Sequence, residues 1–145
     1  KKLARFFGLK LSTFWKTLNL DSNDYLVLPI PSHKKRNKER GYCQTELIGK
    51  EFSENLNFRF SKNCLIREKE TLFMNKLNSN ERAANINGAF KIINSLDGEK
   101  NIILLDDILT TGSTMCEIAK TIHKDYPNIN LVGLTIAAGD TWDKV

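Results

Sequence analysis

The sequence predicts an α/β domain with a mostly parallel sheet flanked by helices. Three observations support this class. Short apolar runs alternate along the chain with segments of helical periodicity, as in βα units. Two of the runs end abruptly, one in proline and one in a pair of acids, as strands do at the edge of a sheet. The length of 145 residues suits one domain with a single core. We therefore expect residues 1–145 to form one domain.

The first half of the chain supplies two helices and two strands. Leu3 to Leu20 is predicted to be a helix with a broad apolar stripe used for packing. Tyr25 to Ile30 is a short apolar run that Pro29 and Pro31 end, because proline cannot continue a ladder of hydrogen bonds. Gln44 to Asn57 is predicted to be a helix, and Phe58 to Ile66 a second strand. The helix prediction depends on apolar residues spaced by four: Ile48, Phe52 and Leu56.

The second half begins with a polar segment and then returns to strands. Arg67 to Asn87 is long, charged and weakly patterned, which indicates a functional loop or a mobile flap. Gly88 to Ile93 is expected to be extended, and Ile102 to Asp106 is the clearest strand of the chain. Leu131 to Ala137 is the last predicted strand. Between these two strands a helical face is formed by Met115, Ile118, Ala119 and Ile122.

The positive charge of the chain is concentrated in one segment. The formal net charge is +5, and residues 33–40 carry +4 of it, which leaves +1 for the rest. Such a concentration predicts an anionic partner at one place rather than a protein that is basic all over. The segment contains Lys34, Lys35, Arg36, Lys38 and Arg40.

Other features of the composition bear on the compartment. The three cysteines are isolated and odd in number, so they predict neither a disulfide framework nor a zinc site, and they favour a reducing compartment. The sequence has no apolar run long enough to cross a membrane and no signal peptide. We therefore expect a soluble, cytoplasmic protein without membrane insertion. Because the sequence starts at Lys1 without methionine, we also expect that an N-terminal segment is missing.

The most informative stretch is LLDDILTTGST, residues 104–114. Asp106 and Asp107 follow a buried apolar run, and open parallel sheets bind ligands where such strands end. The hydroxyl residues around Gly112 stand at the start of a predicted helix, where glycine permits close approach and backbone N–H groups can converge on a phosphate. Thr114 and Glu117 also fit a capping box at this helix start.

The two acids suggest the rest of the ligand. Carboxylates repel phosphate, but they accept hydrogen bonds from vicinal sugar hydroxyls or from the water shell of a metal ion. Phosphate donors a few residues from hydroxyl acceptors together indicate a sugar phosphate. The competing phosphate motifs GxxxxGK[ST] and GxGxxG are both absent from the sequence.

The segment IILLDDILTTGST, residues 102–114, resembles the signature of the type I phosphoribosyltransferases, which share the ligand 5-phosphoribosyl 1-pyrophosphate (PRPP). Two further blocks resemble the ComF family of competence-associated, phosphoribosyltransferase-like proteins. One is the segment LPIPSHKKRNKERGYCQTELIGK from Leu28 to Lys50, and the other is ERAANINGAF from Glu81 to Phe90. The sequence departs from the family at Cys43, which replaces a usual Asn, and at Met74, which replaces a frequent Gln. It also lacks the zinc-ribbon cysteines often found upstream.

The resemblance implies a type I phosphoribosyltransferase fold with a mobile flap, and it implies roles for individual residues. Asp106, Asp107 and Arg82 are the expected catalytic residues, with Arg82 bringing positive charge from the flap to the leaving pyrophosphate. A structural salt bridge of Arg82 with Glu81 or Glu68 is an equally open alternative. Mg²⁺ is expected with PRPP, held through its oxygens and by Asp106 or Asp107 through water. The expected PRPP-binding residues are Thr110, Thr111, Gly112, Ser113, Thr114, Ser32, Lys34, Lys35, Arg36 and Arg40.

The function implied by the resemblance is PRPP binding in natural transformation, with single-stranded DNA and other competence proteins as expected partners. Two alternatives stay open: a salvage or amido-type phosphoribosyltransferase, and a non-catalytic PRPP-responsive module that binds DNA or regulates. The acceptor of a phosphoribosyl transfer and the existence of enzymatic activity are not defined by the sequence. The basic loop is one candidate DNA surface. The basic residues of the opening helix are another: Lys1, Lys2, Arg5, Lys10 and Lys16.

Overall fold

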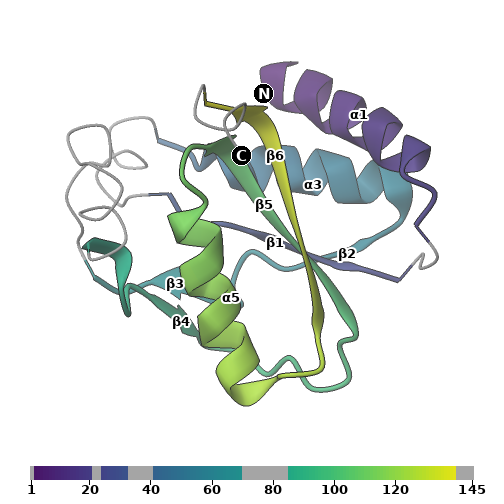
Figure 1. Ribbon diagram of the computed structural model, residues 1–145. Helices are drawn as coiled ribbons and strands as arrows, with labels where there is room; N and C mark the ends of the chain where they lie inside the picture. The colour runs from purple at the N-terminus through teal and green to yellow at the C-terminus, as the bar shows by residue number, and fades with distance from the viewer. Residues whose placement is uncertain (1, 21–23, 33–40, 70–84, 140–145) are drawn as a thin grey trace.

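The computed structural model describes residues 2–20, 24–32, 41–69 and 85–139. These residues form a four-stranded parallel sheet with the order β2-β1-β5-β6, and a separate antiparallel hairpin of β3 and β4 (Figure 1). The predicted α/β class with a mostly parallel sheet is therefore confirmed. The strands are β1 (Leu26–Pro29), β2 (Arg59–Phe60), β3 (Leu65–Arg67), β4 (Phe90–Ile92), β5 (Asn101–Leu109) and β6 (Asn130–Ala138).

Helices cover both faces of the sheet. Helices α1 (Lys2–Thr17) and α3 (Gln44–Leu56) lie on one face, and α5 (Ser113–Asp125) lies with the β3–β4 hairpin on the other (Figure 1). Alternate residues of β5 divide between the two cores, because neighbouring side chains of a strand point to opposite faces. Ile103 and Leu105 belong to the core with α1 and α3, whereas Ile102 and Leu104 belong to the core with α5.

Most predicted elements are confirmed, with two corrections of extent. The predicted strand from Phe58 to Ile66 is wrong as a single element, because the chain turns within it and forms β2 and β3 in different sheets. Strand β5 runs to Leu109 instead of ending at Asp106, because its pairing with β6 continues past the two acids. The predicted flap, Arg67 to Asn87, lies mostly outside the described residues, which resume at residue 85.

Helix α1 is held against α3 by a close backbone contact at Gly8. A Cβ atom added at Gly8 would lie 2.5 Å from Cβ of Glu51 and 3.1 Å from the backbone nitrogen of Phe52. The hydroxyl of Ser12, one turn on, donates to the carbonyl of Gly8 at 2.7 Å. Trp15, near the end of the helix, packs edge-on against Phe52, with ring centroids 5.9 Å apart. The helix is thus fixed on one face and leaves its other face outward. Among the described residues, no helix is long and apolar enough to cross a membrane.

The contact at Gly8 predicts that Gly8→Ala destabilises the protein despite the better helix propensity of alanine. Overpacking costs about 1–3 kcal/mol, whereas the propensity gain is at most about 1 kcal/mol. Urea denaturation should therefore show a lower free energy of unfolding for this variant. Thr13→Ala, an exposed change in the same helix, is the control and should stay within about 0.5 kcal/mol of the wild type. Equal stability of Gly8→Ala and wild type would contradict the packing of α1 on α3.

Candidate functional site

The site is built where the buried part of β5 reaches the edge of the sheet. From Ile102 to Leu105 every residue of β5 is at most 2% exposed, and Asp106 is the first that is only partly buried. The alternation along the strand continues past this point, so Asp106 lies on the α5 face and Asp107 on the face of α1 and α3. Only a ligand that crosses the end of the strand could contact both carboxylates.

The surroundings of Asp106 favour its neutral form. Burial is the main reason that the pKa of Asp106 is raised to about 7, and the nearby negative charge of Asp107 acts in the same direction. Two interactions oppose this rise. The backbone N–H of Asp107 donates to Oδ1 of Asp106 at 2.8 Å, and the positive charge of Arg67 stabilises the carboxylate. A carboxylate that is costly to ionise in the free protein is therefore kept at the edge of the sheet.

The loop after β5 has the backbone shape that the sequence predicts for phosphate binding. Gly112 precedes α5 in the left-handed region, with φ 73° and ψ −6°, a conformation that glycine adopts without steric cost. The hydroxyls of Thr111 and Ser113 hydrogen-bond to each other beside it. The hollow lined by Asp106 and by the loop measures about 20 Å³, enough for one water molecule. A phosphate would thus rest on the loop rather than inside a closed cavity.

The predicted capping box at Thr114 and Glu117 is wrong. The helix begins at Ser113, so Thr114 lies within its first turn, and the residue at the cap position is Gly112 without a side-chain hydrogen bond. Glu117 instead accepts a hydrogen bond from the backbone N–H of Gly88 at 2.7 Å. The second turn of α5 is therefore tied to the segment before β4, and no carboxylate caps the N–H groups of the first turn.

The end of β1 lies beside the two acids. The backbone N–H of Ile30 donates to the carbonyl of Leu105 at 2.8 Å, which places Pro31 and Ser32 next to the end of the buried part of β5. Thr45, in the first turn of α3, donates from its hydroxyl to the carbonyl of Ile30 at 2.8 Å. Ser32 and Cys43 therefore both lie at this edge, and Oγ of Ser32 is 3.6 Å from Sγ of Cys43.

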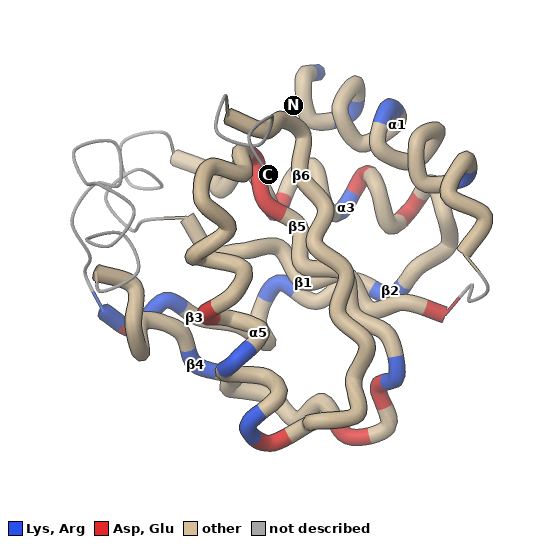
Figure 2. Tube along the Cα trace, viewed as in Figure 1, with Lys and Arg blue, Asp and Glu red and all other residues tan. Residues whose placement is uncertain are grey.

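The structure brings together part of the predicted set. Asp106, Asp107, Ser32 and the loop from Thr110 to Thr114 share one edge of the sheet, and Figure 2 shows the acids at the end of β5. The remaining predicted residues lie outside the described residues: Lys34, Lys35, Arg36, Arg40 and Arg82.

Sequence reasoning missed Arg67, the last residue of β3. Its guanidinium carbon lies 5.5 Å from the ring centroid of Phe90 on the paired strand, and its charge lowers the pKa of Asp106. The sequence does contain a signal for Arg67, because this residue directly follows a short apolar run, Cys64 to Ile66. Asp106 follows the apolar run Ile102 to Leu105 in the same way. The charged residues after Arg67 instead favour its assignment to the polar loop.

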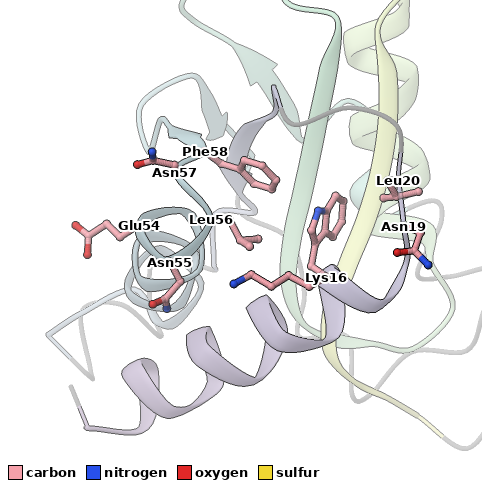
Figure 3. Close-up of a pocket in the computed structure, with 9 residues that line it drawn as sticks. Lys16, Asn19, Leu20, Glu54, Asn55, Leu56, Asn57 and Phe58 are labelled. Carbon is pink, nitrogen blue, oxygen red and sulfur yellow. The ribbon is translucent and has the colours of Figure 1, made fainter.

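A larger cavity lies away from this edge. It measures about 560 Å³ and lies between the last turns of α1 and α3, where Lys16, Leu56 and Phe58 face it (Figure 3). Asn19 and Leu20 precede β1, whereas Asn57 and Phe58 precede β2, so this cavity lies at the amino ends of the strands. Ligands of parallel sheets bind at the opposite edge. Among the described ranges, no three His, Cys, Asp or Glu side chains gather as metal ligands.

Comparison with known proteins gives relatives over most of the chain. Competence protein F of Haemophilus influenzae is 32% identical over 126 residues, which are 86% of this chain and 55% of that protein. DNA utilization protein YhgH of Escherichia coli O6:H1 is 28% identical over 123 residues, which are 85% of this chain and 53% of that protein. This chain therefore spans about half the length of the curated relatives it matches. No family model matches it.

Two solved structures align with the chain at low identity. The alignment with adenine phosphoribosyltransferase from Leishmania tarentolae covers 96% of this chain and 76% of the enzyme's chain, at 17% identity and a TM-score of 0.42. The alignment with the enzyme from Leishmania donovani covers 99% of this chain and 72% of the enzyme's chain, at 14% identity and a TM-score of 0.43. With TM-scores below 0.5, these alignments carry no weight of their own. The parallel sheet and the TTGST loop after β5 are the features consistent with a type I phosphoribosyltransferase fold.

The raised pKa of Asp106 predicts a pH-dependent stability. Between pH 3.8 and about 7 the carboxyl is ionised in the unfolded chain but protonated in the folded one, so the free energy of unfolding falls as the pH rises. Asp106→Asn cannot ionise and therefore keeps this free energy of unfolding at high pH. Its thermal midpoint should equal that of the wild type near pH 4 and exceed it at pH 8, by roughly 2–8 °C for each kcal/mol of unfolding free energy that the wild type loses.

Asp107→Asn makes the same chemical change one residue along the strand, and it removes a negative charge that raises the pKa of Asp106. Because burial is the larger cause of that rise, the difference between Asp107→Asn and the wild type should vary with pH in the same direction as for Asp106→Asn, but less. A thermal midpoint of Asp106→Asn that stays at or below that of the wild type at pH 8 would refute the cost of ionising Asp106.

Proposed function

Because the chain is a homologue of the ComF-type proteins Competence protein F and YhgH, we propose that it binds PRPP at the carboxyl edge of its sheet and acts in DNA utilization. One observation carries the ligand assignment: the buried part of a parallel strand ends at Asp106 and Asp107, and the strand then leads into a TTGST loop and a helix start. The names of the relatives support the cellular role.

The residues divide the ligand between two loops. The 5′-phosphate would rest on the loop at Gly112, where backbone N–H groups and the positive end of the α5 dipole favour an anion. The ribose hydroxyls would donate to Asp106, whose position on the α5 face is on the same side as that helix. The pyrophosphate would then extend toward Ser32 and the basic segment that follows it.

Mg²⁺ fits this arrangement as a partner of PRPP. Magnesium usually keeps several waters and is bound by one or two carboxylates together with substrate phosphates. Asp106 and Asp107 could supply one such carboxylate, directly or through water. When bound, the ion would neutralise negative charge on the pyrophosphate.

The reaction of this site would be displacement of pyrophosphate at C1 of the ribose by a nucleophilic acceptor. A second role is a PRPP-responsive module without catalysis. The sequence leaves this role open, because it defines no acceptor for a phosphoribosyl transfer. Pyrophosphate release from PRPP, measured with amine, nucleobase and DNA acceptors in turn, separates the two roles.

The ligand assignment predicts that Asp106→Asn and Asp107→Asn both weaken PRPP binding. A hydrogen bond to a charged acceptor contributes about 1.5–3 kcal/mol, so Asp106→Asn should raise the Kd about tenfold or more. Asp107→Asn should have a smaller effect, because Asp107 lies on the other face of the strand and would act through Mg²⁺ and its waters. Calorimetric titration with PRPP and Mg²⁺ at pH 8 measures this. Asp125→Asn, in the last turn of α5, keeps the charge change but lies outside the site and should bind as the wild type does. Unchanged affinity in both site variants would eliminate the assignment.

We predict that Gly112→Val also loses PRPP binding, for a different reason. A side chain at φ 73° is strained by about 1–2 kcal/mol, and valine would also place methyl groups where the phosphate approaches. The free variant should unfold a few degrees lower than the wild type, and PRPP should no longer raise its thermal midpoint. Gly98→Val has a similar positive φ, 83°, on a distant loop and controls for strain alone. PRPP protection that persists in Gly112→Val would show that the phosphate binds elsewhere.

A further inference from the structure

The outward face of α1 carries an alternation of cations and aromatic rings. Lys2, Phe6, Lys10 and Phe14 follow one another at intervals of four residues, a rise of about 6 Å for each step. Both phenylalanines are 53% exposed, and both lysines are exposed. The ammonium nitrogen of Lys10 lies 5.8 Å from the ring centroid of Phe6. We call these four residues the α1 stripe.

Packing does not explain the α1 stripe. The opposite face of α1 already supplies the buried contacts with α3 and the sheet, through Ala4, Leu11 and Trp15. The stripe instead borders a shallow groove of about 430 Å³ between α1 and the edge strand β6, which Phe6, Lys10 and Phe14 line on one side and Ile136 on the other. Large rings are therefore kept at the surface beside a hollow.

The two elements that border the groove, α1 and β6, carry charge of one sign only. Helix α1 contains Lys2, Arg5, Lys10 and Lys16 and no acidic residue, and β6 contains no charged residue (Figure 2). A ligand that complements this face must be anionic and must offer flat apolar groups. Single-stranded nucleic acid has both, since its phosphates pair with Lys and its unstacked bases stack on aromatic rings.

A second copy of the chain fits less well, because it would bring this basic face against itself, at the cost of like-charge repulsion. An anionic bilayer is the alternative that the vesicle measurement below separates, since lysines beside exposed rings can extend their ammonium groups to the headgroups. In a duplex the bases are stacked within the helix and offer no free face to Phe6 or Phe14.

We propose that the α1 stripe is a contact surface for single-stranded nucleic acid, with bases stacked on Phe6 and Phe14 and phosphates near Lys2 and Lys10. The proposal rests on the proposed role in DNA utilization. It adds a surface for that role that is separate from the PRPP loop and composed only of described residues.

The test is fluorescence anisotropy of a labelled thymidine oligonucleotide with the whole 145-residue chain. The double variant of Phe6→Ala and Phe14→Ala should bind at least about tenfold more weakly, because each base stacked on an aromatic ring contributes a severalfold gain in affinity. Ile93→Ala is the matched control, since it removes an apolar side chain that is 48% exposed on another element. It should bind as the wild type does.

A second variant tests the charges. The double variant of Lys2→Gln and Lys10→Gln should reduce the slope of log affinity against log salt by about 1.4, or about 0.7 for each phosphate that a lysine no longer neutralises. Duplex DNA of the same length should bind more weakly than the single strand. Equal affinity of the aromatic double variant and Ile93→Ala would overturn the proposal, as would a preference for duplex.

Two further measurements separate this proposal from its alternatives. PRPP affinity should be unchanged in all of these variants, because the α1 stripe is separate from the PRPP loop. If the wild-type chain itself does not bind PRPP, the proposed ligand is wrong and the proposal for the α1 stripe is not affected. Vesicles containing phosphatidylglycerol test the membrane alternative. If the aromatic double variant lost vesicle binding but kept its affinity for the oligonucleotide, the α1 stripe would be a membrane surface and the proposal would be wrong.

Discussion

The parallel pairing of β5 with both β1 and β6 is the constraint on which the rest of the structure depends. A strand buried on both faces and paired on both sides can contain only apolar residues, as Ile102 to Leu105 do. A carboxylate can appear only where the strand reaches the edge of the sheet. Because β1 runs parallel, its end reaches the same edge, and one backbone hydrogen bond from Ile30 to Leu105 places Ser32 there. Two loops far apart in the sequence thereby meet at one place.

The cost of this arrangement falls on Asp106. Burial raises its pKa, and the charge of Arg67 compensates only in part, so the free protein holds a group that would be more stable as a neutral side chain. Such a conflict between stability and local chemistry is typical of sites that bind a ligand. The hydrogen bond of Glu117 to Gly88 has a related consequence, because it leaves the N–H groups of the first turn of α5 without a capping carboxylate.

The class of fold, the helices and the central strands could be predicted from the sequence. Their apolar periodicity is a local property that can be recognised without knowing the tertiary contacts. The sequence also located Asp106, Asp107 and the TTGST loop, since burial and charge conflict visibly within a few residues. The split of residues 58–66 into two sheets could not be predicted, because its apolar residues serve different cores. The cap of α5 was misassigned because Glu117 has a partner distant in sequence. Arg67 was missed because its importance arises from a hairpin that approaches β5 only in the folded chain.

The most direct test of PRPP binding at this edge is a titration of ¹⁵N-labelled protein with PRPP and Mg²⁺, followed by amide chemical shifts. We predict the largest changes at Thr111, Gly112 and Ser113 and at Asp106 and Ser32, which together form one edge of the sheet. Small changes are expected at Asn19 and Asn57, beside the larger cavity at the opposite edge. Large changes at Asn19 and Asn57 with an unaffected TTGST loop would contradict the assignment of the ligand to the carboxyl end of β5.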